Sequence, residues 1–415
     1  MADVDFAARV TRATKQMRVL FAPTPLQRND FLSAKYEAEI YLKREDLSPV
    51  RSYKIRGAFN AIVKALDAGK KGPFVCASAG NHAQGVAYVC AHFGVQAVIY
   101  MPVTTPKQKL HKTGSFGGGN VKIKLEGDYF DDTLRAAQDF CAKAGAVFVP
   151  PFDSEDVIIG QASVAAEIMA QMPEDEHPDM LVLPVGGGGL AAGMTRYLRG
   201  QNIDFRFVEP QGGPSLQAAL QAKELVTLPR VDSFVDGAAV ARIGARNFKA
   251  LQDVPLAHVI IAPEDRICAT MIEMLNVEGV VLEPAGALAI DGLRDIERIA
   301  GKTVVAVVSG GNFDFERLPD VKERALRWAG LKKYYILQMP QRPGALKDFL
   351  NILGPKDDIA RFEYLKKSAR NFGSVLIGIE TGEPGGFARI EAEMQAQGFA
   401  FEDITNNAAL ANFIV

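Results

Sequence analysis

One stretch of the sequence reads Arg51-Ser52-Tyr53-Lys54-Ile55-Arg56-Gly57-Ala58-Phe59-Asn60 and places a lysine between an extended segment and a helical pattern. Apolar residues recur at intervals of three and four as far as Leu66, which predicts a helix over 54–67 with Lys54 in its first turn. The positive end of the helix dipole disfavours a cation, which lowers the pKa of Lys54 and favours a neutral, nucleophilic amine. A solvated surface lysine is the alternative for this residue taken alone.

Length and composition limit the classes of protein. A chain of 415 residues is too long for one hydrophobic core, so two or three structural units are expected. A formal net charge of −2, without a basic stripe, argues against nucleic-acid binding. No segment approaches transmembrane length, and the N-terminus lacks the apolar run of a signal peptide. The histidines lack zinc-ligand spacing, and the 4 scattered cysteines suit reduced thiols in a cytosolic protein.

Short β-branched runs alternate with helical patterns from residue 73 to about 325. The predicted strands are 74–77, 95–101, 121–125, 146–149, 180–185, 205–209, 258–262 and 303–309. The predicted helices are 81–93, 106–113, 129–143, 155–172, 189–199, 263–276 and 284–299. Such alternation is typical of parallel sheets with helices on both faces and ligands at the carboxyl ends of the strands. This many elements suits two lobes better than one sheet.

The pattern changes near residue 328. Strands at 334–339, 358–365, 375–380 and 399–404 and helices at 344–353 and 386–397 give the order βαββαβ. This order describes a small, separate domain with its helices on one face of a sheet. A binding or regulatory role and a packing or oligomerisation role are both open for residues 328–415.

Two loops have alternative interpretations. Ser78-Ala79-Gly80-Asn81-His82-Ala83-Gln84-Gly85 follows a predicted strand, and Ser78 and Asn81 can cap the next helix, whose exposed N–H groups can also hold a carboxylate. Ser309-Gly310-Gly311-Asn312 follows another strand, and Ser309 can be a helix cap or a hydrogen-bonding partner of a ligand. The cap is favoured for Ser309 on its own.

Four consecutive glycines, Gly186, Gly187, Gly188 and Gly189, lie between a predicted strand and a helix. Their cost in backbone entropy is hard to explain for a mere connection, whereas bare N–H groups at a helix start form a phosphate cradle. A dinucleotide site is a rival interpretation, because Gly186, Gly188 and Ala191 fit the loose GxGxxA form. Glu209 ends the next predicted strand, where a ribose-binding acid belongs.

Together these stretches resemble the fold-type II pyridoxal-phosphate enzymes, and most closely the threonine dehydratases (threonine ammonia-lyases). The matching pieces, in the family's order between about residues 15 and 325, are Thr24-Pro25-Leu26, Leu42-Lys43-Arg44-Glu45-Asp46-Leu47, Ser52-Tyr53-Lys54-Ile55-Arg56-Gly57-Ala58, Ser78–Gly85, Val185–Ala191 and Ser309–Asn312. The segment 334–346 resembles an ACT-like regulatory domain, and only one copy fits, as in the shorter biosynthetic form. The resemblance implies an α/β catalytic domain over 1–327 of the tryptophan synthase β type. A smaller lobe is inserted at about 45–150, and an α+β ACT-like domain spans 328–415.

The resemblance also implies the roles of individual residues. Lys54 binds pyridoxal 5'-phosphate covalently and later removes the Cα proton of the substrate. The phosphate lies on Gly186, Gly187, Gly188, Gly189 and Leu190. The substrate carboxylate is bound by Ser78, Ala79, Gly80, Asn81 and His82. Asn81 also hydrogen-bonds the ring hydroxyl, and Ser309 faces the pyridine nitrogen, where a neutral hydroxyl leaves the ring a weaker electron sink than an aspartate would.

The implied reaction is β-elimination from L-threonine to 2-oxobutanoate and ammonia, the first step of isoleucine biosynthesis, with lesser activity on L-serine. The resemblance further implies a cytoplasmic homotetramer, inhibited by isoleucine and responsive to valine through its C-terminal domain.

Some residues depart from the patterns of relatives. Ala79 replaces a second serine found in serine racemases, which predicts elimination without appreciable racemisation. Glu209, Gly213 and Ser215 match the racemase divalent-cation loop only in part, so no metal is expected. Asn406, Asn407 and Asn412 replace charged residues of the tail, which bears on the response to isoleucine.

Two other classes of function compete with this interpretation. A nicotinamide-dependent oxidoreductase would use the loop 186–191 with Glu209, but it leaves Lys54 and Ser309 without roles. A non-catalytic amino-acid sensor would use residues 333–415 and bind an effector without turnover.

Overall fold

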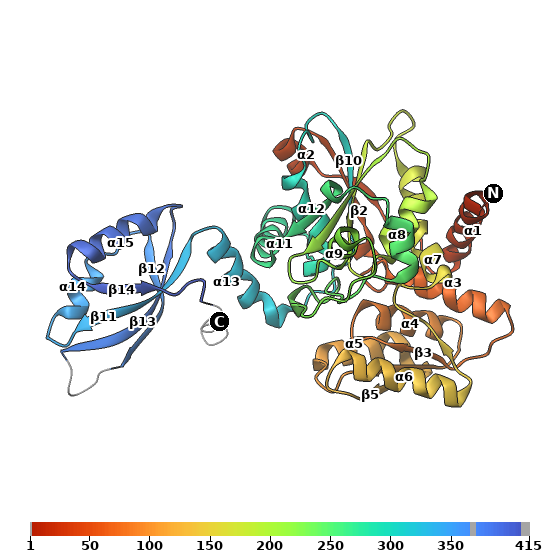
Figure 1. Ribbon diagram of the computed structural model, residues 1–415, viewed down its shortest axis with the longest axis horizontal. Coiled ribbons are helices and arrows are strands. Elements are labelled where there is room, and N and C mark those ends of the chain that lie inside the picture. The colour runs from red at the N-terminus through yellow and green to blue at the C-terminus, as the bar shows by residue number, and fades with distance from the viewer. Residues whose placement is uncertain (1, 366–370, 408–415) are drawn as a thin grey trace. The chain divides into compact units, whose positions relative to one another are not determined.

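The larger sheet of the computed structural model has the strand order β1-β2-β10-β7-β8-β9; Figure 1 labels its neighbouring strands β2 and β10. Its strands are β1 (Leu26–Arg28), β2 (Glu39–Arg44), β7 (Met180–Pro184), β8 (Asp204–Pro210), β9 (Val259–Ala262) and β10 (Thr303–Val308). All neighbours pair in parallel except β1 with β2. The central strands are nearly continuous apolar runs, which suits a parallel sheet buried on both faces. β10 lies between β2 and β7 and so pairs with strands that are distant from it in sequence.

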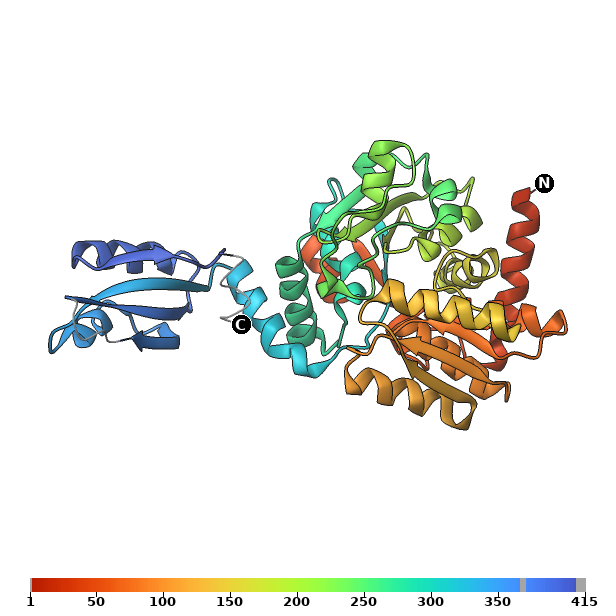
Figure 2. The ribbon, with the colours of Figure 1, turned by 60° about the horizontal axis from the view of Figure 1, so that its bottom comes forward.

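A second, all-parallel sheet has the order β5-β4-β3-β6, from β3 (Phe74–Ala77), β4 (Ala97–Met101), β5 (Val121–Leu125) and β6 (Val147–Phe148). Alternate residues of β3 and β4 face opposite layers. Cys76 and Ile99 pack with α3 and α4, whereas Val75 and Tyr100 pack with α6, so helices cover both faces (Figure 2). The predicted two-lobed parallel architecture is therefore confirmed.

The helices of this part of the chain surround the two sheets. They are α1 (Ala2–Gln16), α2 (Asp30–Tyr36), α3 (Lys54–Asp67), α4 (Asn81–His92), α5 (Lys107–Gly117), α6 (Phe130–Ala144), α7 (Glu155–Gln171), α8 (Gly189–Tyr197), α9 (Ser215–Ala222), α10 (Ala245–Leu251), α11 (Glu264–Glu278) and α12 (Pro284–Gly292). The predicted helix 54–67 is confirmed as α3. The predicted helix 284–299 is too long, because α12 ends at Gly292 and a 3-10 turn, Leu293–Asp295, follows.

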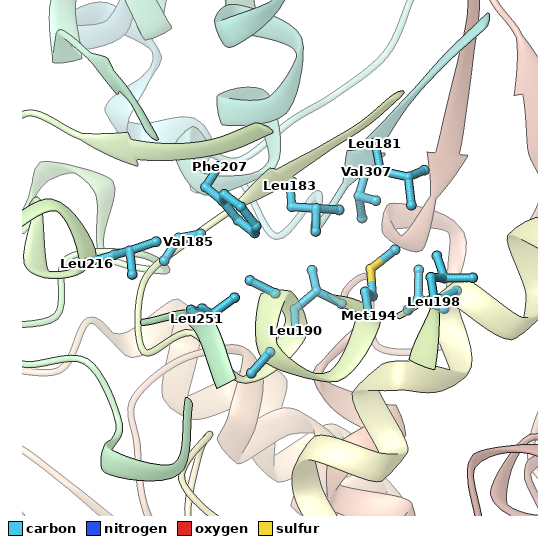
Figure 3. Packing of buried hydrophobic residues seen from close by; sticks show 14 of the residues in the cluster. Leu181, Leu183, Val185, Leu190, Met194, Leu198, Phe207, Leu216, Leu251 and Val307 are labelled. Atoms are coloured by element: carbon cyan, nitrogen blue, oxygen red, sulfur yellow. The ribbon is translucent and has the colours of Figure 1, made fainter. Parts of the chain in front are cut away.

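The main core lies between the larger sheet and α8. Figure 3 shows the facing side chains, which are Leu181, Leu183 and Val307 from the strands, Leu190 and Met194 from α8, and Leu198 directly after that helix. The last three positions recur at intervals of four, which puts them on one side of the helix. This packing fixes the start of α8, and hence the glycine loop before it, against the end of β7.

The structure describes residues 2–365 and 371–407 and divides into two compact units, Met1–Ile267 with Met274–Asp314 and Cys268–Glu273 with Phe315–Val415. The second unit contains α13 (Leu318–Trp328) and then β11 (Lys332–Pro340), α14 (Ala345–Leu350), β12 (Asp357–Leu365), β13 (Phe372–Thr381), α15 (Gly386–Ala396) and β14 (Ala400–Asp403). The unit boundary lies before α13, whereas the predicted domain boundary, residue 327, lies inside that helix.

The strands of the second unit pair antiparallel in the order β12-β13-β11-β14. Tyr335, Leu337 and Met339 alternate along β11 into one buried cluster, which also contains residues of α14 and α15. Both helices thus cover one face, and the predicted βαββαβ order is confirmed. Of the unusual tail residues, Asn412 lies outside the described part of the chain.

Candidate active site

Lys54 is the first residue of α3, and its side chain is partly buried. Its Nζ donates to the carbonyl oxygen of Pro151 at 3.2 Å. Burial lowers the pKa of Lys54 to about 8, against an opposing effect of the Glu283 carboxylate. The amine is therefore neutral in a far larger fraction of molecules than an exposed lysine would be, which favours the reactive-amine interpretation over a solvated lysine.

Backbone contacts bring the predicted loops to Lys54. The Tyr53 N–H donates to the Ser309 carbonyl at 3.1 Å, and Ser52 forms a β-bridge with Gly310. On the other side, Phe152 follows the Pro151 carbonyl that accepts from Lys54. A Cβ added to Gly187 would lie 2.2 Å from the Phe152 ring. The lysine thus lies between the strand end at 309 and the glycine loop.

The glycine loop is closely surrounded. A Cβ on Gly186 would lie 2.8 Å from the backbone of Ala238, and Gly188 has a φ of +83°. Asn247 donates through Nδ2 to the Gly187 carbonyl at 2.6 Å. No side chain of the described residues caps α8. The first backbone N–H groups of this helix therefore have no side-chain acceptor at the loop. Leu190 is buried in the core, so only its backbone is available to a ligand.

The loop 78–82 begins α4. Ser78 Oγ accepts from the Gly80 N–H at 3.2 Å, and Asn81 is the first helical residue with its side chain directed to Glu283. The capping interpretation of Ser78 and Asn81 is therefore wrong. Burial, assisted by the nearby Lys54 cation, lowers the pKa of His82 to about 3. His82 is thus neutral, with Nε2 2.8 Å from the Val149 carbonyl oxygen.

A chain of polar side chains crosses this region. Lys112 of α5 donates to Asn312 Oδ1, Asn312 Nδ2 donates to Asn81 Oδ1 at 2.6 Å, and Asn81 Nδ2 donates to Glu283 Oε1 at 2.6 Å. Glu283 precedes α12 and is 5% exposed. Burial, together with the repulsion of Asp236, raises its pKa to about 7. Sequence reasoning missed Glu283, although an acid directly before Pro284 at a helix start was a usable signal.

Ser309 directly follows β10 and is 3% exposed. Its Oγ donates to the Ala285 carbonyl at 3.0 Å, and the next element is the 3-10 turn Phe315–Arg317. The helix-cap interpretation of Ser309 is therefore wrong, because no α-helix begins in the described residues 310–314 that follow it.

Comparison with known proteins matches residues 18–310 to the family of pyridoxal-phosphate dependent enzymes and residues 323–414 to the C-terminal regulatory domain of threonine dehydratase. The chain belongs to the threonine dehydratase family. It is 42% identical over 411 residues to the L-threonine dehydratase biosynthetic IlvA of Bacillus subtilis (strain 168), covering 98% of this chain and 96% of that protein. It is 45% identical over 393 residues to the protein of the same name from Mycobacterium bovis, covering 94% and 91%.

The fold agrees with this assignment. The structure of the processed threonine deaminase isoform 2 from Solanum lycopersicum matches with a TM-score of 0.72 and 33% identity, over 78% of this chain and 88% of that chain. Pyridoxal phosphate is accordingly the cofactor of this threonine dehydratase family member, as its sequence predicts.

The residues present fit that cofactor. A partly buried amine with a lowered pKa suits an aldehyde, and the cradle at Gly187, which a Cβ would fill, suits a phosphate. Ser52 Oγ and His82 Nδ1 are buried without a hydrogen-bond partner among the described residues, which leaves polar capacity for ligands beside Lys54.

The site does not fit the dinucleotide interpretation. Glu209 is fully buried and accepts the backbone N–H groups of Leu216 and Gln217 at 2.7 and 2.8 Å, so it caps α9 and cannot bind a ribose. Within the described ranges, no group of three or more His, Cys, Asp or Glu side chains could hold a metal. Nor is any described helix long and apolar enough to span a bilayer.

Proposed function

We propose that this protein catalyses β-elimination of L-threonine to 2-oxobutanoate and ammonia, the first step of isoleucine biosynthesis. The observation that carries the proposal is the placement of Lys54, a partly buried amine with a lowered pKa between the glycine loop and Ser309. The family assignment supports the same reaction, since the curated relatives are named L-threonine dehydratases.

The site residues divide the work. Lys54 binds the cofactor and then takes the proton from Cα of the substrate. The amides of Gly186–Gly189 and Leu190 bind the phosphate. Ser78, Ala79, Gly80, Asn81 and His82 bind the carboxylate. The bound cofactor supplies an electron sink for the pair left at Cα.

The leaving group then departs from the β-carbon. Loss of the Cα proton and the β-hydroxyl, as water, gives 2-aminocrotonate, which hydrolyses to 2-oxobutanoate and ammonia. Ser309 would hold the ring nitrogen with a neutral hydroxyl, which would leave the cofactor a weaker electron sink and favour elimination over transamination. Ala79 carries no hydroxyl to protonate the opposite face of Cα. L-Serine is eliminated more slowly than L-threonine, and no D-serine accumulates from it.

Turnover of the purified holoprotein tests the proposal. 2-Oxobutanoate formation from L-threonine is measured for the natural chain, for Lys54→Ala and for Lys64→Ala, a lysine-to-alanine control on the same helix. Lys54→Ala abolishes turnover with an unchanged circular dichroism spectrum, whereas Lys64→Ala retains it. Retained turnover in Lys54→Ala, or none in the natural chain, contradicts the proposal.

The second unit is proposed to bind isoleucine as inhibitor and valine as a counter-effector. Its match to a regulatory domain supports this role over one in packing alone. A chain ending at Arg327 is expected to keep threonine turnover and to lose inhibition by isoleucine. Inhibition that persists in this shorter chain places the effector site elsewhere. We further propose a cytoplasmic homotetramer, which light scattering of the purified chain tests by mass.

A further inference from the structure

Lys112, Asn312, Asn81 and Glu283 form a row of hydrogen-bonded side chains. Lys112 at one end can only donate, and the ionised carboxylate of Glu283 at the other end can only accept. A lysine ammonium can only donate, so Asn312 must present its carbonyl oxygen to Lys112 and its NH2 group to Asn81. An ionised carboxylate can only accept, so Asn81 must present its NH2 group to Glu283. The two ends therefore permit one orientation of both amides.

Glu283 is held where it can impose that orientation. A Cβ on Gly310 would lie 2.0 Å from Glu283 Oε1, so the carboxylate occupies space that only a glycine leaves open. Asn81 and Glu283 lie 202 positions apart in sequence, and the bond between them joins the start of α4 to the start of α12. When Glu283 is ionised, such a short bond to a buried acceptor is stronger than a neutral one.

We propose that Glu283 in its ionised form is a positioning residue, which fixes the Asn81 amide so that Asn81 acts as a donor toward the ring hydroxyl of the bound cofactor. The inference rests on the role proposed for Asn81. A donor at this place stabilises the ionised hydroxyl, because the second hydrogen of the Asn81 NH2 group remains available after the first is given to Glu283.

At the other end of this row of hydrogen-bonded side chains, Lys112 of α5 helps to fix the orientation of Asn81. Lys112 belongs to the lobe built on the smaller sheet, and Asn312 to the loop after β10 of the larger sheet. Asn312 Nδ2 also lies 2.8 Å from the Val50 carbonyl, so its side chain is held from two sides. Contact between the lobes through Lys112 thus helps to set the donor at the ring hydroxyl.

The visible absorption of the resting holoprotein, without substrate, tests the proposal across pH 6–9. The charged groups facing Glu283 are Asp236, Lys109 and Lys112, with Lys54 and the phenol of Tyr53 on α3. Glu283→Gln keeps the shape but can donate or accept, so both Asn81 orientations become possible. In the natural protein, ionisation of Glu283 is expected to change the visible absorption with a midpoint near pH 7. Glu283→Gln is expected to remove this change and to weaken cofactor binding about fivefold. Lys112→Met shifts the spectrum less in the same direction.

The matched control is Lys107→Met, an exposed lysine on the same helix, which leaves the spectrum unchanged. Asn312→Asp provides an independent variant should Glu283→Gln not fold. It replaces a donor by an acceptor toward Asn81 and is expected to reproduce the spectral change. Spectra of Glu283→Gln or Asn312→Asp that superimpose on the natural protein at every pH overturn the proposal. The measurement uses no substrate, so failure to turn over threonine would leave its result intact.

Discussion

Replacement of Glu167 by glutamine tests how the helix that carries Lys54 is held. Glu167 is 3% exposed on α7, and its Oε2 accepts from Arg56 at 2.7 Å and from Lys43 at 2.8 Å. Its Oε1 accepts from Arg56 at 2.8 Å and from Arg18. Arg56 lies two residues after Lys54 and also binds Glu45. The cluster thus has three cations and two carboxylates, one carboxylate fewer in the variant.

The expected cost follows from this burial. A glutamine offers one acceptor oxygen where the carboxylate offers two, and its NH2 group faces donors. Breaking a buried ion pair by removing one partner costs about 3–5 kcal/mol. With a urea m-value of about 3 kcal/mol/M, the unfolding midpoint falls by about 1–1.7 M. Glu155→Gln is the matched control on the same helix, because its pair with Arg196 is partly exposed and contributes at most about 1 kcal/mol.

The pH dependence provides a second check. Burial tends to raise the pKa of Glu167, but Arg56 and Lys43 outweigh it and hold this pKa well below the ordinary value. An acid with a lowered folded pKa adds stability above its unfolded pKa, about 4.3, and this stability is lost as pH falls. The difference between natural chain and variant is therefore constant from pH 7 to about pH 5 and narrows as the pH falls below the unfolded pKa of about 4.3.

Unfolding in urea, followed by the absorbance of the bound cofactor, reports the first unit alone, which matters because a chain of two units need not unfold in one step. Equal midpoints for the natural chain and Glu167→Gln at pH 7 refute the reasoning. So does a difference that is the same at about pH 3 as at pH 7.

Three further outcomes are expected. Because the pKa of Lys54 is about 8, the neutral amine rises about tenfold from pH 7 to 9, and stopped-flow absorbance should show cofactor binding to apo-protein accelerating accordingly; a rate independent of pH contradicts the assignment. Gly187→Ala places a carbon 2.2 Å from the Phe152 ring, so equilibrium titration should show cofactor affinity at least about tenfold weaker, whereas Gly114→Ala, with open space around it, should match the natural chain. Phe349→Ala removes a fully buried ring from the second unit, at about 3–5 kcal/mol, and should abolish the isoleucine response while threonine turnover persists; a retained response refutes the regulatory proposal.

The elements that sequence predicted well are those with a strong period of their own. α3 begins at Lys54 and ends at Asp67 as its apolar spacing predicts, and the strands of both sheets lie within a few residues of the apolar runs. Short elements without such periods were missed: β1, α9 and α10 span three to eight residues and are defined by their tertiary contacts.

Parts of the site that are formed by one local sequence motif could be predicted. Parts that depend on contact between two segments distant in sequence could not. The glycine loop and Lys54 are local patterns, whereas the bond from Asn81 to Glu283 depends on how α4 and α12 pack. For Glu209, the sequence suggested a ligand-binding role that the structure excludes. Its position after a strand suggested a ribose-binding acid, but its two acceptor contacts are with the backbone of α9, which sequence spacing could not reveal.

The glycines that made the motifs recognisable are also what hold the lysine in place. A Cβ on Gly286 would lie 1.9 Å from the Gly310 carbonyl oxygen, and one on Gly85 would lie 3.2 Å from the Ile55 backbone. α12 and α4 thus approach the chain beside Lys54 at backbone distance, which side chains would prevent. Because a Cβ on Gly310 would also displace Glu283, that glycine serves both the packing of α12 and the orientation of Asn81. These glycines therefore position the amine of Lys54 through backbone packing, independently of any contact with a ligand.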